Sequence, residues 1–100
     1  MVWIDGGFCR GTDIVKAKIL GADVVGLGRL QCWALAAGGI PGAVRMLELL
    51  EIEIKQCMSL LGMTDWATGD PAMLQAAPVV TSPSVYSAFP LLDTRSADWY

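Results

Sequence analysis

The chain is 100 residues long, which is the size of a single small domain. Its hydrophobic share of 54%, with 11 glycines besides, exceeds that of an average globular domain, and because a domain this small hides only about two-thirds of the surface of its unfolded chain, a partner or further structure must cover the excess. A net charge of −3 with only seven scattered lysines and arginines argues against nucleic acid as a partner.

The first elements expected are a short buried strand, a glycine turn and a helix. The apolar run 2–4 is ended by an aspartate and two glycines at 5–7, as a buried parallel strand would be. A helix follows, for which Thr12 or Asp13 can provide the cap, and it ends before Gly21. A strand, a tight turn and a helix N-terminus in this order direct backbone N–H groups toward whatever lies above the turn. An anion is the natural occupant.

A second strand and a second glycine turn follow. The run 23–27 is apolar over strand length and is closed by Gly28 and Arg29. The order of elements predicts a βαβ unit with parallel strands and a right-handed crossover. Both turns then lie at the carboxyl ends of neighbouring strands, where (β/α)8 barrels commonly bind phosphate, and Arg29 would add a charged donor. From the residues alone it is equally possible that the glycines only permit tight turns and that Arg29 is a surface residue.

Two further helices are expected before residue 63. A short helix over 30–37 is ended by two glycines, and a long helix over 41–61 opens on a proline and is ended by a glycine. The longest uncharged stretch, 30–44, falls short of the roughly 20 residues that cross a membrane, and it contains three glycines and a proline. We therefore expect no membrane span.

The remaining features concern the C-terminal tail, the cysteines and the cellular location. Prolines interrupt any periodicity after residue 63, so residues 63–100 are expected to form an irregular tail. The three cysteines, Cys9, Cys32 and Cys57, are odd in number and far apart, which favours reduced thiols and a cytoplasmic location. No secretory signal is readable, and without a CxxC motif or any histidine the usual zinc sites are missing.

Several short motifs of the chain occur together in one known family. They are Asp5-Gly6-Gly7, Arg10-Gly11-Thr12-Asp13, Lys16-Ala17, Leu20-Gly21-Ala22-Asp23, Gly28-Arg29 and Trp33-Ala34-Leu35-Ala36-Ala37-Gly38. With the long helix that follows, they resemble the C-terminal segment of the FMN-dependent 2-hydroxy acid dehydrogenases and oxidases, the family of glycolate oxidase, lactate oxidase and mandelate dehydrogenase. The resemblance covers about the first two-thirds of the chain.

The resemblance implies a fold and a cofactor. The fold would be α/β, the C-terminal β7-α7-β8-α8 part of a (β/α)8 TIM barrel, with 1–62 as its last two βα units and 63–100 as an irregular, proline-containing tail packed on the barrel. The cofactor would be FMN, whose ribityl chain contacts the aspartate and whose phosphate is held by the backbone of the first turn and closed in by the second. The cofactor-binding residues implied are Asp5, Gly6, Gly7, Phe8, Cys9, Gly28 and Arg29.

The resemblance also implies an enzyme of which this chain is only a part. The whole protein would oxidise a small 2-hydroxy acid to a 2-oxo acid, would include the missing N-terminal barrel part as a partner, and would be a homo-oligomer when complete. In the family, a histidine base, a substrate-binding arginine and a lysine near the flavin lie upstream of this segment. The chain has no histidine, so it carries no catalytic residue of its own and is expected to be inactive alone.

The chain departs from the family pattern in the first and second turns. Cys9 stands where the family usually has an arginine, and the loss of a charged donor would cost about 1.5–3 kcal/mol of phosphate binding. Leu30 stands where the family usually has a proline. Arg10 matches a second arginine of the family that has a different role, so it is not counted among the site residues.

Residues outside the two turns receive structural interpretations. Glu48, Glu51 and Glu53 are spaced as a solvated helix face rather than as an acid and base pair. Trp3 and Trp33 are interpreted as core or inter-helix packing residues rather than as flavin-stacking groups.

Two other functions stay open on the residues alone. One is a stand-alone, non-catalytic phosphate- or nucleotide-binding module, which should be a soluble monomer, whereas a barrel fragment should associate through its uncovered strand edges. The other is a fragment of another phosphate-binding barrel such as inosine monophosphate dehydrogenase, which shares the Asp-Gly-Gly turn. The Arg-Gly-Thr-Asp continuation at 10–13 favours the hydroxy acid family.

Overall fold

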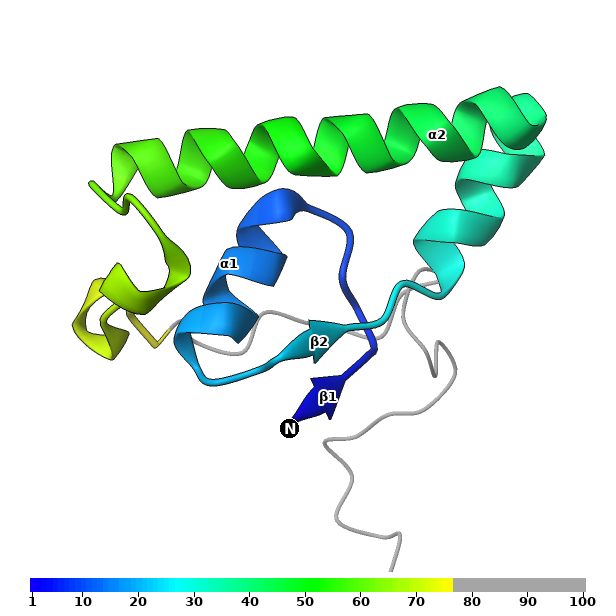
Figure 1. Ribbon diagram of the computed structural model, residues 1–100. Coiled ribbons are helices and arrows are strands. Elements are labelled where there is room, and N and C mark those ends of the chain that lie inside the picture. Colours follow the sequence, from blue (N-terminus) through cyan, green and yellow to red (C-terminus); the bar gives the residue numbers. More distant parts are fainter. Residues whose placement is uncertain (77–100) are drawn as a thin grey trace, which may run out of the picture.

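The computed structural model describes residues 1–76, which form two short strands, two helices and two 3-10 helices (Figure 1). In chain order these are β1 (Trp3–Ile4), α1 (Gly11–Ile19), β2 (Val24–Val25), α2 (Arg29–Leu60), η1 (Trp66–Thr68) and η2 (Pro71–Met73). The greater part of the tail predicted from the sequence, 77–100, lies outside the described residues. Within 1–76, no helix combines the length and the apolar character that crossing a membrane demands.

The two strands pair in parallel, and α1 connects them. Trp3 lies opposite Val24 and Ile4 lies opposite Val25, which confirms the parallel βαβ unit expected from the sequence. The ladder is extended beyond β2, because the amide of Gly26 donates to the carbonyl of Ile4 at 2.8 Å. The turns that follow the two strands therefore both begin at the edge formed by the carboxyl ends of the strands.

Helix α1 begins earlier than the sequence pattern predicts. Its N-cap residue is Arg10, in extended backbone, so the prediction of Thr12 or Asp13 as the cap was wrong. Asp13 lies instead in the first turn, where its carboxylate accepts hydrogen bonds from the two residues that precede the helix. The end of the helix is as expected, since Leu20 is its C-cap and Gly21 follows with a φ of +100°.

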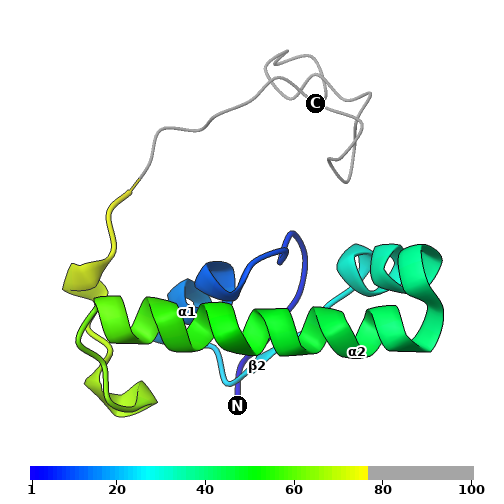
Figure 2. The ribbon, with the colours of Figure 1, turned by 90° about the horizontal axis from the view of Figure 1, so that it is seen from above.

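Helix α2 is bent into two arms, as Figure 1 and Figure 2 show. Gly38 and Gly39 leave helical geometry, and Gly39 has a φ of +59°, so a short arm (29–37) and a long arm (40–60) meet there. A Cβ on Gly42 would lie 2.4 Å from the carbonyl oxygen of Ala34, which means that the arms touch close to the bend. The two helices expected from the sequence are thus confirmed, and Gly62 follows the long arm with a φ of +70°.

The small core lies between α1, the long arm of α2 and the segment that follows it. Val15, Ile19 and Met63 are buried at its centre. They are surrounded by half-buried residues, namely Ile54, Cys57, Met58, Leu61 and Leu74. The segment after α2 also reaches α1 through Lys18, whose Nζ lies 5.9 Å from the centre of the Trp66 ring.

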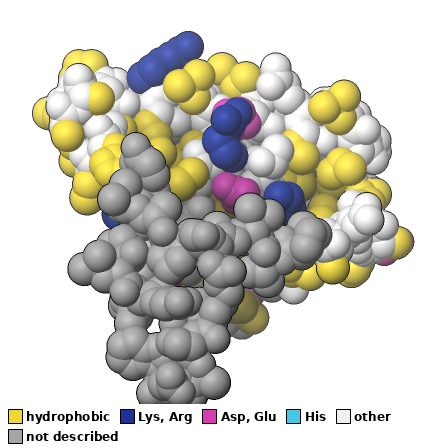
Figure 3. All heavy atoms as spheres, turned by 180° about the vertical axis from the view of Figure 1, so that it is seen from behind, with side chains coloured by type: hydrophobic (Ala, Val, Ile, Leu, Met, Phe, Trp, Pro, Cys, Tyr) yellow, Lys and Arg dark blue, Asp and Glu magenta, His cyan; other side chains and the backbone are white. Residues whose placement is uncertain are grey.

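Much of the apolar excess seen in the composition remains on the surface of the described part. Trp3 is 72% exposed and Ile40 is 78% exposed, and Figure 3 shows hydrophobic side chains spread over the visible part of one face. Within 1–76, Trp3 is thus mostly exposed and does not belong to the core, where it was expected to pack. Exposed apolar side chains of this size are typical of a surface that contacts further structure.

Candidate functional site

The two glycine turns come together and line one cavity. The first turn (5–9) follows β1 and the second (28–29) follows β2, and because the strands are parallel neighbours, both turns lie at the same edge. The cavity has a volume of about 320 Å³. All seven residues that the resemblance implied line it: Asp5, Gly6, Gly7, Phe8, Cys9, Gly28 and Arg29.

The first turn presents its backbone to this cavity. Gly6 and Gly7 have φ values of +98° and +78°, which residues with a Cβ rarely adopt. A Cβ built on either glycine would meet nothing within 4 Å, so the space beside the turn is open. Among the described residues, none accepts a hydrogen bond from the amides of 6–8. Successive unpaired backbone amides at a concave surface are a typical binding site for an anion.

One cationic and one anionic side chain add to the lining. Arg29 opens α2, and a guanidinium can bind two oxygens of a phosphate at once. Asp5 ends β1 and offers a carboxylate that can accept hydrogen bonds from the hydroxyls of a ligand. With amide donors, a guanidinium and a carboxylate, the lining fits a phosphate group attached to a polyhydroxyl chain. The described residues of this lining include no histidine, lysine or tyrosine.

Sequence reasoning missed three residues of this lining, Gly26, Leu30 and Trp33. A Cβ on Gly26 would lie 3.0 Å from the Cβ of Asp5, so this glycine allows Asp5 to approach the second strand. A glycine within a strand pattern is a known sign of such an approach. Trp33, interpreted as a packing residue, is 45% exposed and lies at the edge of the cavity.

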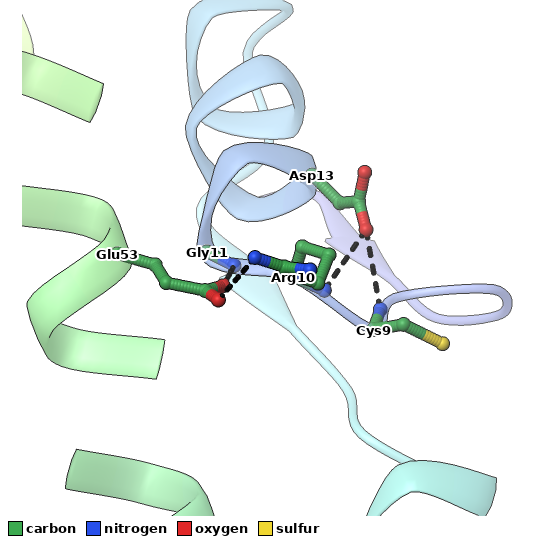
Figure 4. A network of polar contacts seen from close by, with 5 residues as sticks. All are labelled: Cys9, Arg10, Gly11, Asp13 and Glu53. Atoms are coloured by element: carbon green, nitrogen blue, oxygen red, sulfur yellow. Dashed lines mark hydrogen bonds and ion pairs between the residues drawn. The ribbon is translucent and has the colours of Figure 1, made fainter. Parts of the chain in front are cut away.

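Arg10 and the amide of Cys9 are engaged outside the cavity (Figure 4). The Nη2 atom of Arg10 lies 2.7 Å from Oε1 of Glu53, and Arg10 does not line the cavity of the two turns. The amide of Cys9 donates to Oδ2 of Asp13 at 3.2 Å. Cys9 therefore offers the cavity its side chain, whereas its backbone donor is already in use.

The prediction of a solvated face was correct for two glutamates of α2 and wrong for Glu53. Glu48 pairs with Arg45 and Glu51 pairs with Lys55, both on the surface. Oε2 of Glu53 instead accepts a hydrogen bond of 2.7 Å from the amide of Gly11. This amide and Arg10 lower the pKa of Glu53, and the same pairing raises the pKa of Arg10, so both groups are charged at neutral pH.

A larger apolar groove lies next to the cavity. Its volume is about 690 Å³, and it runs between the end of the first turn and the two arms of α2. Cys9, Leu30 and Trp33 line both hollows, so the groove and the cavity are adjacent. Leu49, which lines the groove, is 46% exposed.

A family model described as FMN-dependent dehydrogenase matches residues 1–76. Among similar proteins, "Oxidase FUB9" of Gibberella fujikuroi is 49% identical over 71 residues, which are 71% of this chain and 20% of that protein. The L-lactate oxidase of Nostoc is 41% identical over 73 residues, 73% of this chain and 20% of its own. The (S)-mandelate dehydrogenase of Pseudomonas putida is 45% identical over 74 residues, 74% of this chain and 19% of its own.

A solved structure shares the fold. A flavocytochrome b2 variant with sulfite bound matches with a TM-score of 0.67 and 33% identity, over 81% of this chain and 26% of that chain. The chain spans about a fifth of the length of the curated relatives that it matches.

Proposed function

Since this chain belongs to the FMN-dependent dehydrogenase family, we propose that residues 1–62 supply the phosphate-binding turns for FMN in an enzyme that oxidises a small 2-hydroxy acid to a 2-oxo acid. In this proposal the chain forms the last two βα units, β7-α7-β8-α8, of a TIM barrel. The observation that carries it is the single cavity lined by both glycine turns and Arg29. Bound FMN would supply the acceptor for the two electrons that the substrate loses.

The residues of the cavity have separate parts in holding the cofactor. The amides of 6–8 donate hydrogen bonds to the phosphate, and Arg29 neutralises part of its charge. Asp5 accepts a hydrogen bond from a hydroxyl of the ribityl chain. Because Cys9 contributes a thiol and no positive charge, we expect the phosphate to be held less tightly than by a turn with an arginine there.

The chemistry on the substrate falls to residues outside this chain. No histidine is present anywhere in it, so the proton of the substrate hydroxyl must be taken by a group of the remaining barrel. The exposed Trp3 and Ile40 support the presence of that remainder, because each would be covered by neighbouring elements of a closed barrel. The same exposure disfavours a stand-alone binding module, and the family match disfavours an inosine monophosphate dehydrogenase fragment.

The test restores a barrel around the chain. The full 100 residues are fused behind the upstream part of the Nostoc L-lactate oxidase, in place of the segment that matches. We expect a protein of correct size that retains yellow flavin through gel filtration. A matched Arg29→Ala variant should lose about tenfold or more in FMN affinity, since a charge-assisted hydrogen bond is removed.

Two results would contradict the proposal. The first is a fusion that is folded by circular dichroism and still retains no flavin. The second is an unfused chain that behaves as a monodisperse monomer and binds inorganic phosphate by itself, which would favour the binding module.

A further inference from the structure

We propose that Glu53 is a positioning residue for the first glycine turn: it ties the segment that follows the turn to α2, so that the amides of 6–8 are held toward the phosphate. This inference rests on the proposed function for its ligand and on the contacts below for its geometry.

The carboxylates of Glu53 and Asp13 accept hydrogen bonds from three consecutive amides at the start of α1, those of residues 9–11. A helix N-terminus ordinarily leaves its first amides free, and these attract anions. Here the amide of Gly11 donates to Glu53 at 2.7 Å, and the amides of Arg10 and Cys9 donate to Asp13 at 3.0 and 3.2 Å. Within the first turn, which lines the cavity, the amides left to bind an anion are therefore those upstream of Cys9, at 6–8.

Glu53 reaches the turn from a distant part of the chain because the two helices are in direct contact. A Cβ on Gly11 would lie 2.5 Å from the Cβ of Glu53 and 2.6 Å from the amide nitrogen of Ile54, so only glycine fits between them. The guanidinium of Arg10 adds a second bond to the same carboxylate at 2.7 Å. One side chain of α2 thus binds two consecutive residues directly behind the turn, as Figure 4 shows.

The turn itself contains little that would fix its position. Gly6 and Gly7 carry no side chains, and nothing lies within 4 Å of where a Cβ would be. Its amides are therefore placed by its two ends. One end is the pairing of β1 with β2, and the other is held by the bonds of Cys9 and Arg10 to Asp13 together with the anchor at Glu53. Since α2 also begins with Arg29, one bent helix controls both the first turn and the cation of the second.

The experiment uses the fusion described above and compares Glu53→Ala and Glu53→Gln with Glu51→Gln. The control carries the same change on the same helix, and Glu51 pairs with Lys55 on the exposed surface. The first readout is hydrogen exchange of the hydrogen-bonded amides of 9–11 without FMN. The second is the Kd for FMN set against the Kd for riboflavin, which has no phosphate.

We expect Glu53→Ala to speed exchange about tenfold at the amide of Gly11 and at the neighbouring amides of Cys9 and Arg10, and to weaken FMN about tenfold, with riboflavin unchanged. Glu53→Gln should lie between it and the wild type, because its amide oxygen still accepts from Gly11. A residue that only stabilised the fold would weaken both ligands alike.

Each remaining outcome decides one claim. Exchange and FMN affinity equal to those of Glu51→Gln would overturn the anchor, as would equal losses for FMN and riboflavin. If Glu53→Ala does not fold, the same comparison is made with Glu53→Gln. If the wild-type fusion does not bind FMN, the proposed function fails, and hydrogen exchange alone then supports or overturns the anchor.

Discussion

Two regions of this molecule use glycine for opposite reasons. In the first turn, Gly6 and Gly7 face open space, and what requires glycine there is a backbone conformation with positive φ. At the start of α1, Gly11 faces the backbone of α2 so closely that a single methyl group would collide with it. The first region leaves space for a ligand, and in the second region atoms of α2 already occupy the space beside the glycine.

This difference between the turn and Gly11 means that ligand affinity and fold stability depend on different residues of a short segment. The turn can change its affinity for a ligand without loss of the helical core, because no residue of the turn belongs to the cluster around Val15 and Met63. The contact of Gly11 with α2 cannot change without moving one helix relative to the other. Substitutions in the two regions should therefore affect different measurements.

The largest expected effect comes from Gly11→Ala. Its Cβ would lie 2.5 Å from that of Glu53, and overpacking of this kind costs about 3 kcal/mol of unfolding free energy. The matched change Gly7→Ala meets no atom, and only its φ of +78° is unfavourable, at about 1–2 kcal/mol. Urea denaturation of the fusion protein without FMN measures both.

A Gly11→Ala variant as stable as the wild type would remove the distinction between the two regions. Gly7→Ala should in turn raise the Kd for FMN more than that for riboflavin, since the new methyl group stands between the backbone and the phosphate. If Gly7→Ala leaves the Kd for FMN and the Kd for riboflavin as they are in the wild type, the turn is not the phosphate site.

Sequence reasoning reached the features that are encoded locally. The end of the first strand, the bend at 38–39 and the glycines after each helix follow from short patterns, because a positive φ or a break in periodicity is a property of a few neighbouring residues. The second strand was expected over 23–27, and β2 is shorter, at Val24–Val25. The meeting of the two turns followed as well, since a βαβ unit brings strand ends to one edge.

What sequence reasoning missed depends on contacts between distant residues. Glu53 lies 42 residues from Gly11 along the chain, and its place in α2 matches a solvated face as well as a buried contact. At the start of α1 the same contact is involved, because the amide of Gly11, the first residue of the helix, donates to that carboxylate of α2. This contact has no local signature.

A smaller effect, and in the direction of tighter binding, is expected from Cys9→Arg. Cys9 lines the cavity with a thiol, and a guanidinium there would add a charged donor beside the amides of the turn. We expect the Kd of the fusion for FMN to fall about tenfold, with riboflavin unaffected. Cys9→Lys tests charge without the planar geometry and should give less. A Cys9→Arg variant that binds FMN no better would show that the missing charge is supplied elsewhere in the barrel.

The smallest effect concerns pH and distinguishes Glu53 from the surface glutamates. The amide of Gly11 and then Arg10 lower the pKa of Glu53 below its ordinary value of 4.5. The stability that this carboxylate contributes is therefore fully present above pH 4.5 and is lost as the pH falls through the lower pKa of the folded state. The wild type should exceed Glu53→Gln in unfolding free energy at pH 7, and the difference should shrink as the pH falls well below 4.5.

Salt separates this anchor from an ordinary surface pair. Lys55 lowers the pKa of Glu51 as well, so Glu51→Gln should show a pH dependence of the same sign. That pair is exposed on both sides, and about 1 M salt should remove its contribution. Part of the difference for Glu53→Gln should survive, because its largest cause is a hydrogen bond from a backbone amide that carries no net charge. If salt abolished the loss of unfolding free energy in Glu53→Gln as completely as that in Glu51→Gln, Glu53 would act only as a surface charge. The start of α1 would then not be anchored to α2.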